Sequence, residues 1–291
     1  MDSRMEFVRR VLAREKSKSA LCREYGISRV TGDKWLKRYA AGEKLVMVTA
    51  YDAPGAAMAA KAGIDFLLVG DSLAMTVLGH QNTLPATMDE MIHHCKAVRR
   101  GAPDSFVVFD MPFMSYQISL EKAMENAGRA MKEAGADAVK FEGGAEYAPL
   151  ISRLVDAGIP VIPHIGLLPQ RVQAVGGYKV TGRNEEDARR LLNDAKAFEQ
   201  AGAFAIVLEC VTRSVAAEIT SNISIPTIGI GCGPECSGQV QVFHDIVGMF
   251  DGFTPKHSRR YAEAGKMITD ALGTYAREVR EGIFPGDENS F

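Results

Sequence analysis

The stretch Phe66-Leu67-Leu68-Val69-Gly70-Asp71 is an uncharged apolar run that stops on a carboxylate, and its pattern recurs along the chain. Residues 106–110, 138–142 and 205–209 end on Asp110, Glu142 and Glu209, and residues 160–164 end on His164. Runs of this length and composition are typical of buried strands in a parallel sheet. In a closed barrel, the carboxyl ends of the strands form the mouth that holds the active site. The pattern predicts several acids in one mouth, where a cation must offset their charge.

Strand-like and helix-like segments alternate from Leu45 to the C-terminus. The expected strands are 45–50, 66–70, 105–110, 138–142, 160–164, 204–209, 226–230 and, with the weakest pattern, 247–252. The expected helices are 54–62, 88–99 (capped by Thr87 or Asp89), 119–134, 146–157, 185–201, 213–221 and 258–281. Such alternation implies right-handed βαβ units. Seven or eight of these units favour a (β/α)8 TIM barrel over an open doubly wound sheet.

Composition and charge limit the class of protein. The 291 residues are 46% hydrophobic and 24% charged, which suits a barrel of about 250 residues with an extension. The net charge of −2 gives no overall attraction to nucleic acid or to a membrane, and no apolar run reaches the roughly 18 residues of a membrane span. Five cysteines form no even disulfide framework, so we expect a cytoplasmic protein. Cys232 and Cys236 lack two further zinc ligands at a familiar spacing, which favours a structural role.

The N-terminal segment differs from the rest of the chain. Residues 1–44 carry twelve Lys and Arg against six Asp and Glu, whereas the remainder carries 22 against 30. Gly26 at a turn and Trp35-Leu36 on a following helix describe a helix-turn-helix, and residues 4–40 resemble the DNA-binding module of insertion-sequence transposases. We therefore expect a helical extension over residues 1–41 and a catalytic barrel over 42–291. One small basic module binds DNA weakly, so helices that cap the barrel or join subunits, or a fused gene fragment, remain alternatives.

The strand ends carry residue types suited to metal chemistry. Asp71 and Ser72 follow one strand and Asp110 ends the next, while Lys140 and Glu142 lie two apart and so share one side of the sheet. Magnesium prefers hard oxygen ligands of this kind and keeps waters that a substrate can displace. Any single acid could instead cap the following helix, but that reading weakens when four strands repeat the pattern.

Longer motifs carry a resemblance to a known family. They are segments 48–52, 69–73, 83–85, 110–114, 139–144, 164–167, 176–180, 208–211 and 284–286. In this order, from about residue 42 onward, they resemble the ketopantoate hydroxymethyltransferase family. The resemblance implies a (β/α)8 barrel that forms a homo-oligomer, often a decamer. It also implies transfer of a one-carbon unit from 5,10-methylenetetrahydrofolate to 3-methyl-2-oxobutanoate in pantothenate biosynthesis.

The resemblance also implies roles for individual residues. Asp71, Asp110 and Glu142 fall on its Mg²⁺ positions, Asp71, Ser72, Asp110 and Lys140 on its oxoacid positions, and Glu209 on its catalytic base. The family has a histidine at His164, although a strand-end histidine that only hydrogen-bonds to a neighbour is an equal alternative. Loop 170–183, with Arg171, Lys179 and Arg183, could reach the glutamate tail of folate or be a solvated loop. The loop from Cys232 to Gln239 departs from the family pattern, because Ser237-Gly238-Gln239 stands where the family usually has Asp-Gly-Gln, and that aspartate is lost.

Two other functions remain open. Magnesium-dependent lyases and mutases that act on phosphoenolpyruvate and isocitrate use similar strand-end acids. The cysteine-bearing loop typical of the isocitrate-lyase type is missing beside residues 140–142. A DNA-binding regulator with an inactive barrel belongs to a different class. Retention of all five charged site residues (Asp71, Asp110, Lys140, Glu142 and Glu209) argues against an inactive barrel.

Overall fold

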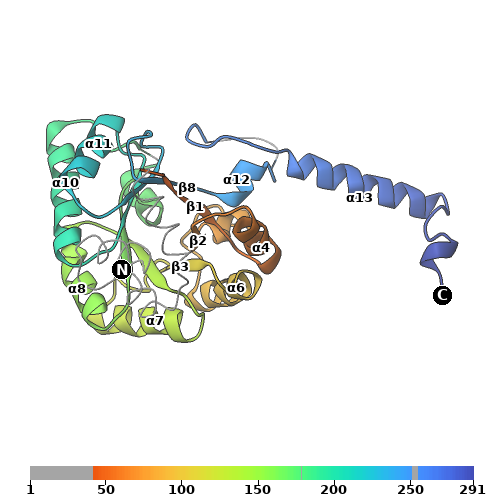
Figure 1. Cartoon of the computed structure of the whole chain (residues 1–291), viewed down its shortest axis with the longest axis horizontal. Coiled ribbons are helices and arrows are strands. Elements are labelled where there is room, and N and C mark those ends of the chain that lie inside the picture. Colours follow the sequence, from red (N-terminus) through yellow and green to blue (C-terminus); the bar gives the residue numbers. More distant parts are fainter. Residues whose placement is uncertain (1–41, 178, 251–254) are drawn as a thin grey trace. The chain divides into compact units, whose positions relative to one another are not determined.

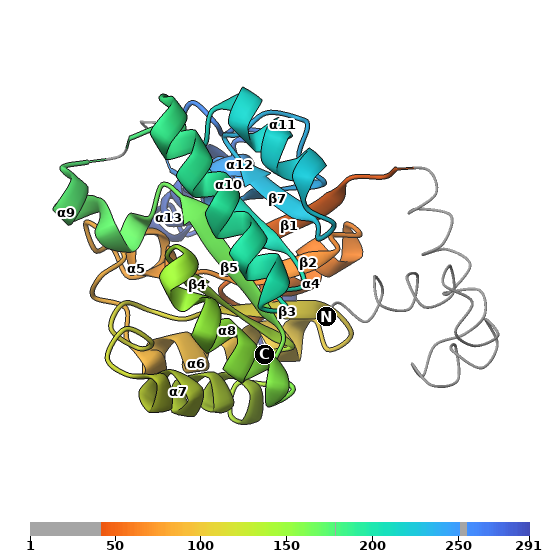
Figure 2. The same ribbon diagram turned by 90° about the vertical axis from the view of Figure 1, so that its left-hand side faces the viewer.

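The structure, a computed structural model, describes residues 42–177, 179–250 and 255–291. In this part of the chain the strands form a closed barrel in the order β1 to β8, and consecutive strands pair in parallel. Helices α4, α6, α7, α8, α10 and α11 surround the strands (Figures 1 and 2). The predicted TIM barrel is confirmed.

The elements have the following bounds. The strands are β1 Leu45–Thr49, β2 Phe66–Val69, β3 Phe106–Asp110, β4 Ala138–Glu142, β5 Val161–Gly166, β6 Ile206–Glu209, β7 Thr227–Ile230 and β8 Gly238–Gln241. The α-helices are α4 Ala53–Lys61, α5 Leu73–Thr76, α6 Met88–Gly101, α7 Leu120–Lys132, α8 Ala148–Asp156, α9 Val172–Val175, α10 Glu185–Gln200, α11 Arg213–Asn222, α12 Phe243–Val247 and α13 Ala264–Arg280. The short 3-10 helices are η1 Ala145–Tyr147, η2 Pro169–Arg171 and η3 Asp287–Asn289.

The chain divides into two compact units after Val240. Within the second unit, the backbone N–H of Tyr261 donates to the carbonyl of Ile246 at 2.7 Å, and the rings of Tyr275 and Phe284 meet at 5.6 Å. The helix-turn-helix predicted for residues 4–40, and the domain predicted for residues 1–41, lie outside the described residues. None of the described helices is long and apolar enough to cross a membrane.

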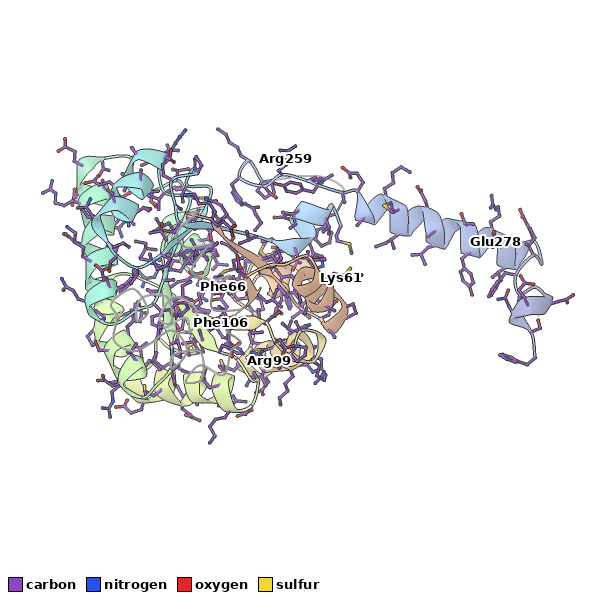
Figure 3. All side chains as sticks on the ribbon, viewed as in Figure 1. Lys61, Phe66, Arg99, Phe106, Arg259 and Glu278 are labelled. Carbon is purple, nitrogen blue, oxygen red and sulfur yellow. The ribbon has the colours of Figure 1, made fainter. Side chains whose placement is uncertain are left out.

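Alternation along the strands separates an apolar barrel core from a polar mouth. Inward side chains near the amino ends of the strands are apolar and pack as one cluster that includes Phe66, Val108, Ala138, Ile162 and Val207. Phe66 meets Phe106 edge to face with ring centroids 5.4 Å apart, and both residues are labelled in Figure 3. Because side chains alternate along a strand, the next inward positions toward the carboxyl ends are those of the charged residues.

Local signals determine where the helices begin. Helix α6 starts at a capping box in which the Thr87 hydroxyl accepts from the N–H of Glu90, and the carboxylate of Glu90 accepts from the N–H of Thr87. Thr87, one of the two predicted caps, is therefore the cap. Asn184 caps α10 in a similar way, through a 2.8 Å bond from the N–H of Asp187.

The strand predicted over residues 247–252 is wrong for the part that the structure describes. Val247 ends helix α12, and Gly248 follows in the left-handed conformation. The eighth strand is instead Gly238–Gln241, where buried Gly238 and Val240 alternate with the half-buried glutamines. This strand has no apolar run because only one of its two buried positions bears a side chain. A Cβ at Gly238 would lie 2.5 Å from the carbonyl of Leu45, so glycine permits the close approach to β1.

Candidate active site

Asp110 and Lys140 form a buried ion pair in the barrel mouth. They are register partners on β3 and β4. Nζ of Lys140 lies 2.7 and 2.8 Å from the two carboxylate oxygens of Asp110, and the side chains are 6% and 2% exposed. Burial opposes the charge of Lys140, but attraction by Asp110, Glu142 and Asp71 raises its pKa above the ordinary value. Lys140 is therefore a fixed cation among the acids.

Asp71 follows β2 and contacts this pair. Its backbone N–H donates to Oδ2 of Asp110 at 3.3 Å, and its own Oδ2 accepts from Nε2 of Gln170 at 2.9 Å. Burial, together with the charge of Asp110, raises the pKa of Asp71 to about 7, although Lys140 and the Gln170 hydrogen bond oppose this shift. Asp71 therefore changes its charge near neutral pH.

His164 lies between two glutamates. Glu142 is its register partner on β4, and Glu209 ends the neighbouring strand β6. Nδ1 of His164 lies 3.7 Å from Oε1 of Glu142, and Nε2 lies 3.4 Å from Oε2 of Glu209. Within the described part of the chain, the two ring nitrogens of His164 and Oε1 of Glu142 have no hydrogen-bond partner. Three buried polar atoms thus lie close together without a hydrogen bond from any described residue.

Burial shifts the pKa values of Glu142, His164 and Glu209. It raises the pKa of Glu142 well above its ordinary range and lowers that of His164 well below, the latter with help from the charge of Lys140. Burial also raises the pKa of Glu209 to about 8. Attraction by Lys140 opposes this rise, and repulsion from Asp71 and Asp110 adds to it. The Glu209 side chain is 18% exposed, against 1% for Glu142. Glu209 is therefore the accessible carboxylate whose basicity suits proton transfer near neutral pH.

Gln170, in η2, joins the acids and was missed by the sequence reasoning. Its Nε2 donates to Asp71 and to the carbonyl of Met111 at 3.0 Å, and its backbone N–H donates to Oε2 of Glu142 at 3.0 Å. Its Oε1 accepts from the hydroxyl of Tyr116 at 2.8 Å, and Gln170 as a whole is only 4% exposed. The available signal was a polar residue after Pro169, in the loop that follows the predicted strand 160–164.

Ser72 lies at the start of α5, directly after Asp71. Its hydroxyl pairs with that of Tyr51 at 2.8 Å. Tyr51 is buried, and burial raises the pKa of its phenol. Tyr51 therefore remains a neutral hydroxyl that orients Ser72.

The donor chemistry of the mouth fits a hard divalent cation. Asp71, Asp110 and Glu142 supply carboxylate oxygens, and Oε1 of Glu142 has no hydrogen bond from the described residues. No three His, Cys, Asp or Glu side chains in the described ranges are gathered as the ligands of one ion. Magnesium commonly takes one or two carboxylates and completes its coordination with water and substrate oxygens. The acids therefore fit Mg²⁺ better than a metal that requires a full protein cage.

The remaining predicted residues lie near the mouth or beside it. Arg171 pairs with Glu146 at 3.1 Å, and Lys179 and Arg183 are exposed on their loop. Cys232 is a buried free thiol whose Sγ accepts from the N–H of Val211 at 3.2 Å and donates to the carbonyl of Leu208 at 3.0 Å. Burial raises its pKa to about 12, which makes the thiol unreactive.

The family model for ketopantoate hydroxymethyltransferase matches residues 29–287. The chain belongs to this family. The 3-methyl-2-oxobutanoate hydroxymethyltransferase of Carboxydothermus hydrogenoformans is 55% identical over 265 residues, which cover 91% of this chain and 96% of that protein. The protein of the same name from Thermotoga neapolitana is 57% identical over 256 residues, covering 88% and 94%. The resemblance seen in the sequence motifs is confirmed.

Solved structures of low identity share the barrel. A 2,3-dimethylmalate lyase of the PEP mutase/isocitrate lyase superfamily superposes with a TM-score of 0.54 at 19% identity, covering 88% of this chain and 89% of that one. Identity at this level shows the fold alone. This chain therefore shares its fold with the lyases and mutases, and the comparison gives no support for their chemistry here.

Proposed function

We propose that this family member transfers a one-carbon unit from 5,10-methylenetetrahydrofolate to 3-methyl-2-oxobutanoate and forms 2-dehydropantoate. The observation that carries the proposal is the identity of 55–57% to hydroxymethyltransferases over about nine-tenths of the chain. The mouth described above supports it, because a buried cation, several acids and an accessible carboxylate meet where an anionic oxoacid would bind.

The oxoacid binds among Asp71, Ser72, Asp110 and Lys140. Asp71, Asp110 and Glu142 would hold Mg²⁺, which when bound supplies a Lewis acid for the oxygens of the substrate. Lys140 offsets the negative charge of the substrate carboxylate, and the Ser72 hydroxyl, oriented by Tyr51, offers a hydrogen bond. These contacts favour the charge that develops on the substrate when C3 loses its proton.

Glu209 is the base in this proposal. Its carboxylate takes the proton from C3, and Nε2 of His164 lies 3.4 Å from its Oε2. The resulting enolate carbon forms a bond to the methylene carbon of the folate. The two bonds from that carbon to the folate nitrogens break, water supplies the hydroxyl of the new hydroxymethyl group, and the nitrogens take up the other proton of that water and the proton held by Glu209. Lys179 and Arg183 are proposed to meet the glutamate tail of the folate.

Turnover tests the proposal directly. Purified protein is incubated with 3-methyl-2-oxobutanoate, 5,10-methylenetetrahydrofolate and Mg²⁺, and 2-dehydropantoate is measured by mass spectrometry. We expect product with Mg²⁺ and a loss of product after treatment with EDTA, restored by added Mg²⁺. Absence of product under all conditions, with a folded protein, contradicts the proposal.

A homo-oligomer and a DNA-binding extension are further proposals drawn from the sequence. In residues 255–291, helix α13 exposes Met267, Ile268, Leu272, Tyr275 and Val279, an apolar surface of the kind that partner subunits cover. Light scattering on the purified protein measures the oligomer. A gel-shift assay at near-physiological salt tests DNA binding by residues 4–40, and absence of a shift ends that proposal.

A further inference from the structure

A cavity lies between the loop after β4, the end of β5 and helix α10, beside the strand ends that carry the acids. Its volume is about 240 Å³, and its backbone walls include Gly143, Gly144 and Gly166. Sites for whole drug-sized ligands measure about 300–1,000 Å³, so this cavity suits a ring system rather than an extended molecule. Figure 2 shows α10 packed along β5 at this side of the barrel.

Asp194 is the buried acid of this cavity. Its side chain is 8% exposed, and its Oδ1 accepts from the backbone N–H of Ala145 at 2.9 Å. Its Oδ2 accepts no hydrogen bond from the described residues, and the nearest cation, Nη1 of Arg190, is 3.6 Å away. A buried carboxylate oxygen without a donor is costly, so its retention points to a ligand that supplies N–H groups.

Two glycines of the cavity wall lie in close contact with their neighbours, and the first of them adjoins this acid. A Cβ at Gly144 would lie 2.6 Å from Oε2 of Glu146 and 3.1 Å from Oδ1 of Asp194. Gly166 has a φ of +103°, and a Cβ there would lie 2.2 Å from the carbonyl of Glu209. Side chains at either position would displace the groups that shape the cavity or the neighbouring catalytic strand.

The cavity is built on the segments that carry the proposed active site. Gly143 follows Glu142 directly, Gly166 is the register partner of Glu209, and Arg171 follows Gln170. A ligand in the cavity therefore lies at the rim of the mouth, next to the strands that hold the proposed base and metal ligands.

The hydrogen-bond acceptors and donors of the cavity wall indicate which edge a bound ligand would present to it. Asp194 and Glu146 are acceptors, and the guanidinium groups of Arg190 and Arg171, whose side chains are 57% and 48% exposed, are donors. A 2-amino-4-oxopyrimidine presents the complementary set on one edge, with an amino group, a ring N–H and a carbonyl oxygen. Pterins and guanine both carry this edge.

We propose that this cavity binds the pterin ring of the folate co-substrate, with Asp194 accepting from its amino group and ring N–H and Arg190 donating to its carbonyl oxygen. This inference rests on the proposed function, which supplies a pterin rather than a guanine. The bound ring places the folate at the edge of the mouth, beside the oxoacid whose C3 must meet its methylene carbon.

Direct binding tests the inference without turnover. Calorimetric titration of the full chain with 6-methylpterin and with tetrahydrofolate is compared for wild type, Asp194→Asn and Glu186→Gln, which removes an exposed carboxylate from the same helix. We expect Asp194→Asn to weaken both ligands at least tenfold and Glu186→Gln to leave them unchanged. Equal binding by wild type and Asp194→Asn overturns the proposal, as does binding of guanosine in preference to the pterin.

A second pair of variants keeps the test decisive if Asp194→Asn does not fold. Arg189 and Arg190 are adjacent exposed residues, and of these two only Arg190 lines the cavity. Arg190→Ala should weaken pterin binding severalfold and Arg189→Ala should not, whereas equal affinities contradict the inference. Deuterium exchange at C3 of the oxoacid needs no folate and should be unchanged in all these variants. Failure of exchange in wild type therefore marks failure of the proposed function, separately from failure of the pterin site.

Discussion

Replacing Gln170 by leucine removes the amide that holds Asp71 while keeping a side chain of similar size. The backbone N–H of residue 170 still donates to Glu142, so the substitution isolates the contacts of the amide. Tyr116 can still donate to the carbonyl of Glu142 at 3.0 Å, which leaves Oδ2 of Asp71 and the carbonyl of Met111 without their Gln170 donor. At about 1–3 kcal/mol for each of these two unsatisfied buried groups, the free energy of unfolding should fall by about 2–6 kcal/mol.

The same substitution should weaken the use of Mg²⁺. The Gln170 hydrogen bond lowers the pKa of Asp71, so its loss raises that pKa further above about 7 and leaves less ionised Asp71 at neutral pH. Loss of a group that orients a metal ligand typically costs about 10–100-fold in metal affinity or activity. We therefore expect the Mg²⁺ concentration for half-maximal C3 exchange to rise by this factor.

Urea unfolding and Mg²⁺ titration of the exchange rate measure the two effects. Gln117→Leu is the matched control, since this half-buried amide donates to the same Gln170 oxygen at 3.2 Å and, among the described residues, otherwise accepts only a long bond, 3.4 Å, from the N–H of Tyr116. It should cost about 1 kcal/mol or less and leave the Mg²⁺ dependence unchanged. If Gln170→Leu matches Gln117→Leu in both measurements, the account of Gln170 is refuted.

Three further predictions concern pH, charge and capping. Glu209 acts as a carboxylate and its pKa is raised to about 8, so the C3 exchange rate should rise with pH through about 8, and a flat profile from pH 6 to 9 would contradict this. Lys140→Met leaves Asp110 buried without its cation and should cost about 3–5 kcal/mol in urea unfolding. Lys122→Met, in an exposed pair, should cost no more than about 1 kcal/mol, and similar losses for the two would count against the buried-pair argument. Thr87→Ala removes the cap of α6 and should lower stability by about 1 kcal/mol, with Thr87→Ser near wild type.

The sequence predicted the elements whose patterns are local. Apolar runs in the sequence predict buried strands such as 106–110 and 138–142, and the alternation of side chains places Lys140 and Glu142 on one face. That Asp110 and Lys140 are register partners depends on how β3 and β4 pair, which no local pattern encodes. The roles assigned to the site residues remain predictions for experiment.

What the sequence did not reveal depends on distant contacts. Gln170 is polar, uncharged and placed in a short turn, and its importance appears only when Asp71 and Tyr116 surround it. The strand Gly238–Gln241 lacks an apolar run because closure against β1 requires glycine. Asp194 resembles any acid on a helix until the loop that contains Ala145 buries it.

Deuterium exchange at C3 of 3-methyl-2-oxobutanoate, without folate, tests the central claim that Glu209 removes this proton beside a metal site. The comparison is between wild type, Glu209→Gln and the exposed-carboxylate control Glu218→Gln, each with Mg²⁺ and with EDTA. We predict Mg²⁺-dependent exchange in wild type and the control, and a loss of about a hundredfold or more in Glu209→Gln. Exchange that survives the Glu209 substitution, or that proceeds equally in EDTA, would contradict the account.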